Sequence, residues 1–242
     1  MDMDPVPFNL IPSAYDIELL FISLAYLFVL IKFLVFLKRK GVDIKITRKL
    51  THIGIGSMML FTLIITNSLI AFLMLAAVAA LFEFSSSKSK FKILDKETFE
   101  VIDRPEAYTG SKLDTTLFEI SGLLTLIIYY FFNNQLNTIA AFLTFVWVDG
   151  MAAIIGMPYG RHKYKAQDTV RSIEGSFAGF VSGFFISAVI YTLWGGTHPS
   201  LIVFALASAF TATVAEAISP EKYDNMATPL ATFIVLELLT KL

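Results

Sequence analysis

Residues 149–176 read DGMAAIIGMPYGRHKYKAQDTVRSIEGS, and this charged stretch joins two largely apolar segments. The two segments, residues 136–156 and 174–194, are each close to the ~20 residues that a helix needs to cross a bilayer. Where they meet, a carboxylate, several small residues, four basic residues and a second carboxylate follow one another. We therefore expect one membrane helix to enter this stretch, another to leave it, and the chemistry to lie between them.

The composition indicates a membrane protein. Of the 242 residues, 56% are hydrophobic and 16% are charged, and the mean hydropathy is +0.69. A soluble domain carries about 25% charged residues. Because the apolar runs are continuous and long enough for helices, we predict an all-α fold. The chain is then a polytopic membrane helix bundle that forms a single domain over residues 1–242.

Eight apolar runs are candidate membrane spans. The last run is the shortest, and if it lies in the membrane interface the number of crossings is seven. The predicted spans are residues 17–38, 50–66, 68–84, 114–133, 136–156, 174–194, 198–218 and 227–241.

The distribution of basic residues predicts an orientation. Cytoplasmic loops are rich in Lys and Arg, and 17 of the 19 basic residues fall in four alternate loops. With those loops inside, the N-terminal segment 1–16 is extracytoplasmic and every charged motif faces the cytoplasm. The four inside loops are residues 38–49, 85–113, 157–173 and 219–226.

Several classes of enzyme are excluded by what the sequence lacks. It contains no Cys, which excludes a nucleophilic thiol and a thiolate metal site. It has no phosphate-binding loop of the GxxxxGK[ST] type, no dinucleotide-binding glycine pattern and no Gly-x-Ser-x-Gly elbow. The three His residues do not form a metal-binding pair. Nothing in the sequence indicates a nucleic-acid partner.

The first motif, RKLTHIG, occupies residues 48–54 at the cytoplasmic start of the second predicted span. If a helix begins there, Arg48 and His52 lie one turn apart on the same face. The alternative interpretation is that Arg48 and Lys49 anchor the helix at the membrane surface and that His52 is an interfacial residue.

Asp149 is the candidate functional carboxylate of the central stretch. An ionised side chain within a span is costly and is by default a functional hypothesis. Ala152, Ala153 and Gly156 follow Asp149 at the spacing of helical neighbours, so a ligand or another backbone can approach this face closely. Helix packing through small residues is the alternative explanation for the Ala and Gly residues, but it does not account for Asp149.

A predicted turn follows this helix. Gly156 and Gly160 flank Pro158, where we expect the helix to end, and backbone amides in such a turn can face an anion. The basic residues after the turn either contact phosphates or anchor the chain at the membrane surface; they are Arg161, Lys163 and Arg171.

The start of the next helix is predicted at Ser172. Ser is a preferred N-cap residue, and the first N–H groups of the helix would then point at the same loop and form an anion site. Glu174, in the first turn with Gly175, suits the helix dipole and could equally hold a metal ion. Later in the chain, Asp224 and Asn225 directly precede the last apolar run, where an Asx-type turn is the alternative to a functional role.

Four motifs, taken together, resemble one family. They are RKLTHIG at 48–54, D-G-x-A-A-x-x-G-x-x-Y-G-R-H-K-Y at 149–164, R-S-I-E-G-S at 171–176, and E-A-x-S-P with D-N within 216–225. This combination resembles the CTP-dependent lipid kinases. That family includes phytol, farnesol and dolichol (polyprenol) kinases and a CTP-using diacylglycerol kinase, and it is related to the phosphatidate cytidylyltransferases.

The sequence departs from the family pattern in one place and from the related enzymes in another. Arg171 stands where the family often has Lys, which keeps the charge and changes the donor geometry. Asp224 and Asn225 stand where the cytidylyltransferases usually carry a His-Gly-Gly…Asp-Arg block, which favours a kinase.

The resemblance implies transfer of the γ-phosphoryl group of CTP to a membrane isoprenoid alcohol. The implied partners are CTP and the lipid alcohol within the bilayer, and Mg²⁺ is the expected cofactor. Its expected ligands are Asp149 first and Glu174 second, and the resemblance adds Asp224 as a metal or nucleotide contact.

The remaining site residues divide between phosphate binding and proton transfer. Either His52 or Asp149 accepts the proton of the alcohol, and the sequence does not choose between them. The residues expected to contact the nucleotide are Arg48, Lys49, Gly156, Gly160, Arg161, Lys163, Arg171, Ser172, Gly175 and Asn225.

Two alternatives remain open at this stage. The first is a CTP-dependent enzyme with a different product, a diacylglycerol kinase or a phosphatidate cytidylyltransferase-like enzyme. The second is a small membrane transporter, which predicts charges through the depth of the membrane rather than at one face. The sequence identifies neither the particular alcohol nor the oligomeric state.

Overall fold

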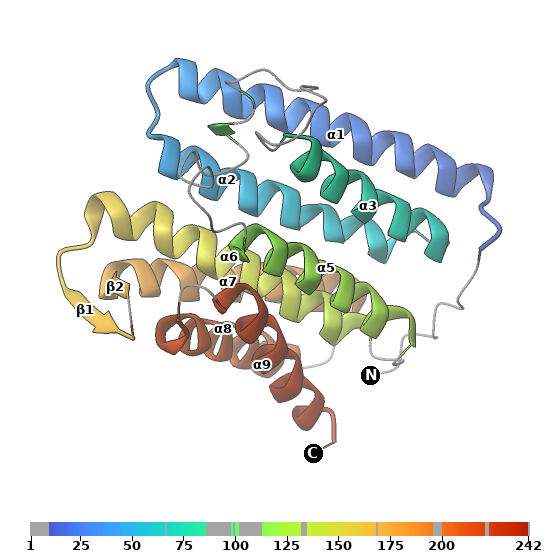
Figure 1. Cartoon of the computed structure of the whole chain (residues 1–242). Coiled ribbons are helices and arrows are strands. Elements are labelled where there is room, and N and C mark those ends of the chain that lie inside the picture. Colours follow the sequence, from blue (N-terminus) through green and yellow to red (C-terminus); the bar gives the residue numbers. More distant parts are fainter. Residues whose placement is uncertain are drawn as a thin grey trace. The chain divides into compact units, whose positions relative to one another are not determined.

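The computed structural model describes residues 10–65, 67–85, 98, 100–101, 113–131, 135–167, 169–195, 200–220 and 223–241. These residues are predominantly helical and group into two compact units, one within Pro7–Glu119 and the other within Ile120–Leu242. Figure 1 labels their helices and strands.

The N-terminal unit is made of helices. It contains α1 (Ala14–Arg39), α2 (Ile44–Ser57), a short 3₁₀ helix η1 (Met58–Leu63) and α3 (Ser68–Ser85), with α1 packed against both α2 and α3. Helix α5 (Leu113–Phe131) begins at the end of this unit and continues into the next.

The second helix begins earlier than predicted, at Ile44, because the chain provides a cap there. The side chain of Asp43 accepts a hydrogen bond from the backbone N–H of Lys45 at 2.7 Å. Such a bond satisfies one of the N–H groups that a helix start leaves without a partner. Gly41, with φ of 88°, lets the chain turn between α1 and α2.

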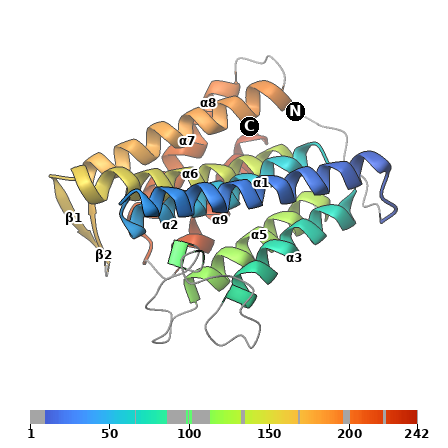
Figure 2. The same ribbon diagram turned by 90° about the horizontal axis from the view of Figure 1, so that it is seen from above.

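The C-terminal unit is built around one central helix. Helix α6 (Gln135–Tyr159) packs against each of α7 (Ile173–Trp194), α8 (Leu201–Ile218) and α9 (Asp224–Leu239). Figure 2 shows α6 with α7 and α8 from a second direction. Most of α6 is buried, which explains why its sequence is apolar on nearly all sides.

Helices α6 and α7 approach closely along a row of glycines. A Cβ atom at Gly179 would lie 2.9 Å from the carbonyl oxygen of Val148, and one at Gly175 would lie 2.6 Å from that of Ala152. Gly183 continues the row, so the three glycines are spaced as in the small-residue packing motifs of membrane helices. No larger residue fits at Gly175 or Gly179 unless the backbones move apart.

Hydroxyl groups join three helices within this unit. Thr144 of α6 hydrogen-bonds both to Ser187 of α7 and to Ser208 of α8, and all three side chains are buried. In a membrane interior such groups find partners in neighbouring helices because no water is available.

Another polar contact fixes how α6 and α9 run past one another. The amide of Asn137, near the start of α6, donates to the carboxylate of Glu237, near the end of α9, at 3.1 Å. The two helices are therefore antiparallel.

A two-stranded hairpin connects α6 to α7. Strand β1 (Lys163–Ala166) pairs antiparallel with β2 (Thr169–Ser172), and Tyr164 lies opposite Arg171. Figure 1 shows the hairpin at one end of α6 and α7. The sequence did not predict these strands, which are the only ones among the described residues.

The predicted fold class, an all-α membrane helix bundle, is confirmed. Seven of the eight predicted spans each overlap one α-helix, whereas the second, 50–66, covers the end of α2 and η1. Four helices are long and apolar enough to cross a membrane: α1, α6, α7 and α8. Two shorter apolar helical segments are Ser68–Ala80 and Thr116–Phe131. Large apolar side chains such as Phe177, Phe185 and Phe210 point outward, as expected for surfaces that face lipid.

Candidate active site

The C-terminal end of α6 is the first component of the site. The helix continues through Pro158 to Tyr159, so the predicted turn around Pro158 is wrong, and Gly156 lies inside the helix. Pro158 has no N–H to donate, so it removes one hydrogen bond of the helix, and it does so in the last turn. The ammonium group of Lys163 donates to the carbonyl oxygen of Gly156 at 3.0 Å, which satisfies one of the last carbonyls of α6.

Ser172 begins α7, as predicted. Its hydroxyl oxygen accepts a hydrogen bond from the backbone N–H of Gly175 at 3.1 Å, in N-cap geometry. A Cβ atom at Gly156 or at Gly175 would lie 2.9 or 3.0 Å from this hydroxyl oxygen, and one at Gly160 would collide with it. The end of α6, the turn and the start of α7 therefore meet at one buried hydroxyl group, and glycine is required on its three sides.

Glu174 binds the turn that precedes the hairpin. Its carboxylate accepts hydrogen bonds from the backbone N–H groups of Arg161, at 3.1 Å, and His162, at 3.2 Å. It also contacts Nδ1 of His162 at 2.6 Å. The sequence placed anion-facing amides in a turn around Pro158, whereas the amides that face an anion here are those of Arg161 and His162, and the anion is the carboxylate of Glu174.

Arg171 lies on the inner face of the hairpin, with 11% of its side chain exposed. Its Nη1 contacts both the carboxylate and the carbonyl oxygen of Glu216, at the end of α8. Its Nη2 lies 3.2 Å from the carbonyl oxygen of Ser219 and 3.5 Å from the carboxylate of Asp224. Its Nε donates to the hydroxyl of Thr169 at 3.2 Å.

Asp149 lies on α6, roughly three turns before the helix ends at Tyr159, with 4% of its surface exposed. It shares a helical face with Gly156, whose Cα meets the start of α7 at Gly175. Asp149 thus lies just past the middle of α6, on the half of the helix that leads to the hairpin. At the start of α9, Asp224 is buried and Asn225 is half-buried.

The structure brings together most of the predicted site residues. Asp149 lies on the half of α6 that leads to the hairpin. The others within the C-terminal unit gather at the hairpin end: Gly156, Gly160, Arg161, Lys163, Arg171, Ser172, Glu174, Gly175, Asp224 and Asn225. Glu216 joins them, and the sequence analysis did not assign it a role. The signal was present in the Glu-Ala-x-Ser-Pro motif that it opens.

The other three predicted residues belong to the N-terminal unit. Arg48, Lys49 and His52 lie on α2, one turn apart as predicted for Arg48 and His52, and all three are half-buried. The ring of His52 lies 4.3 Å from that of Phe118, measured between centroids. In the same turn Thr51 donates to the carbonyl oxygen of Val101 at 2.9 Å.

The expected metal ligands were tested against the positions of the acidic side chains. Among the residues that the structure describes, no three His, Asp or Glu side chains gather as they would around a bound ion. Glu174 contacts the turn and Asp224 contacts Arg171. Mg²⁺ at a nucleotide usually takes one or two protein carboxylates, with phosphates and water completing its coordination. Carboxylates at this end of the unit fit that kind of site.

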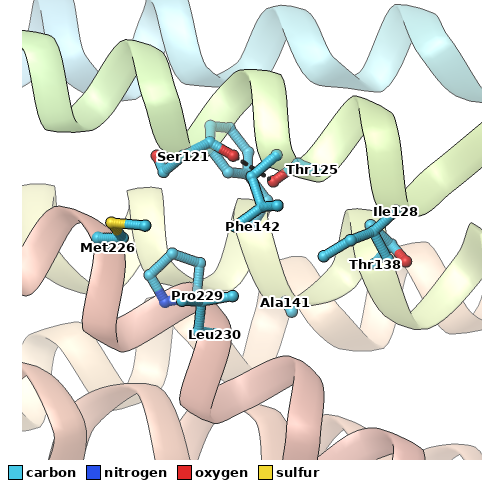
Figure 3. Close-up of a pocket in the computed structure, with 10 residues that line it drawn as sticks. Ser121, Thr125, Ile128, Thr138, Ala141, Phe142, Met226, Pro229 and Leu230 are labelled. Carbon is cyan, nitrogen blue, oxygen red and sulfur yellow. Dashed lines mark hydrogen bonds between the residues drawn. The ribbon is translucent and has the colours of Figure 1, made fainter.

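An apolar pocket lies between α5, α6 and α9 (Figure 3). Its lining is mostly hydrocarbon, with hydroxyl groups from three side chains: Ser121, Thr125 and Thr138. Met226, which lines the pocket, directly follows Asn225 in the first turn of α9. Phe142 lines it from the α6 face that continues to Asp149. The pocket therefore lies along the first half of α6, next to Asn137, and reaches the start of α9 at Met226.

These features define the class of the protein as a membrane helix bundle with a charged hairpin site at one end of its C-terminal helices. No protein-family model matches the chain, and no solved structure matches it.

Two curated proteins are similar to it. One is a phytol kinase of Synechocystis, 25% identical over 195 residues, which cover 79% of this chain and 78% of that protein. The other is an uncharacterized protein of Rickettsia prowazekii, 26% identical over 206 residues, which cover 81% of this chain and 94% of that protein. The chain is therefore a distant homologue of a phytol kinase, and the similarity spans both units.

Proposed function

We propose that the protein is a CTP-dependent kinase of membrane isoprenoid alcohols. In the proposed reaction the alcohol oxygen attacks the γ-phosphorus of CTP, the bond from that phosphorus to the β-phosphate oxygen breaks, and CDP leaves. The alcohol becomes its monophosphate and its hydroxyl proton passes to a base. The observation that carries the proposal is the convergence of the charged motif residues at the hairpin end, in a homologue of a phytol kinase.

The geometry suits phosphoryl transfer, which depends mainly on positioning and on stabilising charge. Exposed cations, Arg161 and Lys163, lie on the turn and on β1 at the water-facing end of the unit. The buried carboxylate of Asp149 lies on the half of α6 that leads to this end, on a helical face with little side-chain bulk. A water-soluble nucleotide and a bilayer alcohol can meet at such a boundary.

We assign Asp149 as the main protein ligand of Mg²⁺. When bound, the ion would supply positive charge that neutralises the charge developing on the phosphates. Arg161 and Lys163 bind the phosphates, and Asn225 contacts the nucleotide from the start of α9. Of the two candidate proton acceptors, Asp149 belongs to the C-terminal unit and His52 to the N-terminal unit.

The lipid acceptor is assigned to an apolar part of the same unit. The pocket between α5, α6 and α9 has a hydrocarbon lining and adjoins Asn225 through Met226. It supports an acceptor whose chain lies among helices while its hydroxyl points toward the nucleotide. We also assign the hairpin end to the cytoplasmic face, because the loops that carry most of the basic residues would then lie inside.

The test is transfer of label from CTP. Purified protein in lipid nanodiscs is incubated with Mg²⁺, γ-³²P-labelled CTP and phytol, farnesol, geranylgeraniol, dolichol or diacylglycerol in turn, with unlabelled ATP as competitor. We expect labelled monophosphate of an isoprenoid alcohol, with CDP released in equal amount, and little competition from ATP.

Other outcomes of this assay contradict the proposal. Release of labelled pyrophosphate with phosphatidate as acceptor would indicate a cytidylyltransferase. Labelling of diacylglycerol alone would identify a different acceptor class. If no acceptor is labelled and CTP causes no thermal shift, the protein does not use CTP and the transporter alternative returns.

A further inference from the structure

The guanidinium of Arg171 is fully engaged with protein oxygens, although the sequence predicts it to bind phosphate. Each of its nitrogens has a partner: Nε contacts Thr169, Nη1 contacts Glu216, and Nη2 contacts Ser219 and Asp224. A guanidinium has only N–H donors and no acceptor. A phosphate could bind Arg171 only by replacing carboxylates that are already in place.

The contacts also complete the ends of two helices. The carbonyl groups of Glu216 and Ser219 belong to the C-terminal end of α8, where the last carbonyls of a helix lack partners within it. A cation at this position is favoured by the helix dipole, and an anion such as Asp224 is favoured at the start of α9. Arg171 therefore joins the end of α8 to the start of α9 as well as pairing with two carboxylates.

The same face of the hairpin is attached to α7. Tyr164 lies opposite Arg171 in the strand pairing, so the two side chains share one face. The hydroxyl of Tyr164 hydrogen-bonds to that of Ser176, in the first turns of α7, at 2.6 Å. The inner face of the hairpin is thus bound to α7 through Tyr164 and to α8 and α9 through Arg171, whereas Lys165 and Val170 point outward.

The position of Arg171 determines the position of the predicted site residues near it. Ser172, the N-cap of α7, is the next residue, and Glu174, which binds the turn at Arg161, follows in the first turn. A shift of β2 away from α8 would therefore move the helix start and the turn together.

We propose that Arg171, Glu216 and Asp224 form a clamp that positions the hairpin for catalysis, and that Arg171 is a positioning residue rather than a phosphate ligand. The role in catalysis rests on the proposed function. The clamp itself, the ion pairing that holds the hairpin on α8 and α9, is a separate property of the fold. Within the clamp, Asp224 serves Arg171, which leaves Asp149 as the carboxylate assigned to Mg²⁺.

A double-mutant cycle tests the clamp. The variants are Arg171→Gln, Glu216→Gln and the two combined, with Val170→Thr as a control on the outward face of the same strand. For each we would measure the thermal unfolding midpoint, kcat, and KM for CTP. We expect each single variant to lower the unfolding midpoint and to lower kcat by about tenfold or more, because either change breaks the same pair.

The pattern of the changes distinguishes positioning from phosphate binding. The clamp predicts that KM for CTP changes by less than about threefold in both single variants, that the double variant is no worse than the single ones, and that Val170→Thr matches the unsubstituted protein. If Arg171 bound phosphate, Arg171→Gln would raise KM strongly and Glu216→Gln, which releases the guanidinium, would leave KM unchanged or lower. That result would overturn the proposal.

Two further measurements test the proposal if Arg171→Gln does not fold or if the unsubstituted protein shows no kinase activity. If Arg171→Gln does not fold, Arg171→Lys keeps the charge but loses the fork geometry, and we expect it to show a smaller loss of the same kind. If the unsubstituted protein shows no kinase activity, the unfolding midpoints still decide the clamp. Additive losses of stability in the double variant would then contradict it, whatever reaction the protein catalyses.

Discussion

The two ends of α6 are both polar, but different kinds of contact hold them. At the hairpin end, Arg171 pairs with Glu216 and Asp224, and the carboxylate of Glu174 accepts hydrogen bonds from backbone amides. At the other end, the hydroxyl of Tyr191 donates to Asn137 at 2.8 Å, and Asn137 donates on to α9.

The comparison distinguishes polar side chains that join helices from polar side chains that we assign to the site. Buried polar groups at both ends join helices, so burial of a polar side chain does not by itself mark a site. The hairpin end differs because it combines exposed cations and a turn with inward-facing amides, and the half of α6 that leads to it carries a buried carboxylate, Asp149. These are the groups to which we assign the binding of phosphate and of Mg²⁺.

The largest effect is expected from Asp149→Asn. This substitution keeps the size of the side chain and removes its charge, so we expect kcat to fall by about 100-fold or more while the unfolding midpoint stays close to that of the unsubstituted protein. Steady-state assays with CTP, together with thermal unfolding in detergent, measure both. An Asp149→Asn protein that folds and keeps full activity would remove Asp149 from the site.

The next largest effect is expected where α6 and α7 pack closely along their row of glycines. Gly179→Val places side-chain atoms against the carbonyl oxygen of Val148, which a Cβ alone would approach to 2.9 Å. We expect this overpacking to lower the free energy of unfolding by about 1–3 kcal/mol, measured by denaturation in mixed micelles. Phe185→Leu, on the lipid-facing side of the same helix, is the matched control. Equal stability of the two variants would mean that α6 and α7 are not in close contact.

A smaller change at the hairpin end is expected from Glu174→Gln. An amide offers one carbonyl oxygen and no charge, whereas the carboxylate accepts hydrogen bonds from the backbone of Arg161 and of His162. Hydrogen bonds to an ionised acceptor are roughly twice as strong, so the turn loosens and kcat/KM for CTP falls by about tenfold. Assays at several CTP concentrations test this. No change in kcat/KM would show that the turn does not contribute to nucleotide binding.

The smallest effect is expected at the other end of α6. Tyr191→Phe removes one buried hydrogen bond and leaves the ring in place, so it should cost about 0.5–1.5 kcal/mol of stability and leave kcat and KM unchanged. The same unfolding and activity assays apply. A loss of activity as large as that of Glu174→Gln would contradict the assignment of a structural role to this end of α6 and a functional role to the hairpin end.

The helices were predictable because each depends on a continuous local pattern. Seven of the eight predicted apolar runs each overlap one α-helix, and Ser172 was identified as a cap from its position before a helical run. The start of α2 was missed because Asp43 caps that helix outside the apolar run, and a cap placed there extends the helix into polar sequence.

The hairpin and its clamp were not predictable in the same way. Each strand has only four residues, too few for an alternating pattern to stand out among charged side chains. The charged partners of Arg171 lie on other helices, the nearer of them, Glu216, 45 residues further along the chain. The sequence predicted that the charge of Arg171 contacts phosphate. Only the packing of α8 and α9 shows that its anionic partners are Glu216 and Asp224.

The orientation can be tested together with the site because the chain has no Cys. A single Cys introduced by Lys165→Cys reports on the outward face of the hairpin, and one introduced by Thr240→Cys reports on the exposed C-terminal end of α9.

The central claim is that the nucleotide binds at the hairpin end. The most direct measurement is the rate at which a membrane-impermeant maleimide labels each variant, with and without CTP and Mg²⁺. We predict that CTP slows labelling of the Lys165→Cys protein several-fold and leaves the Thr240→Cys protein unaffected. Protection of the Thr240→Cys protein alone, or of neither, would contradict the account.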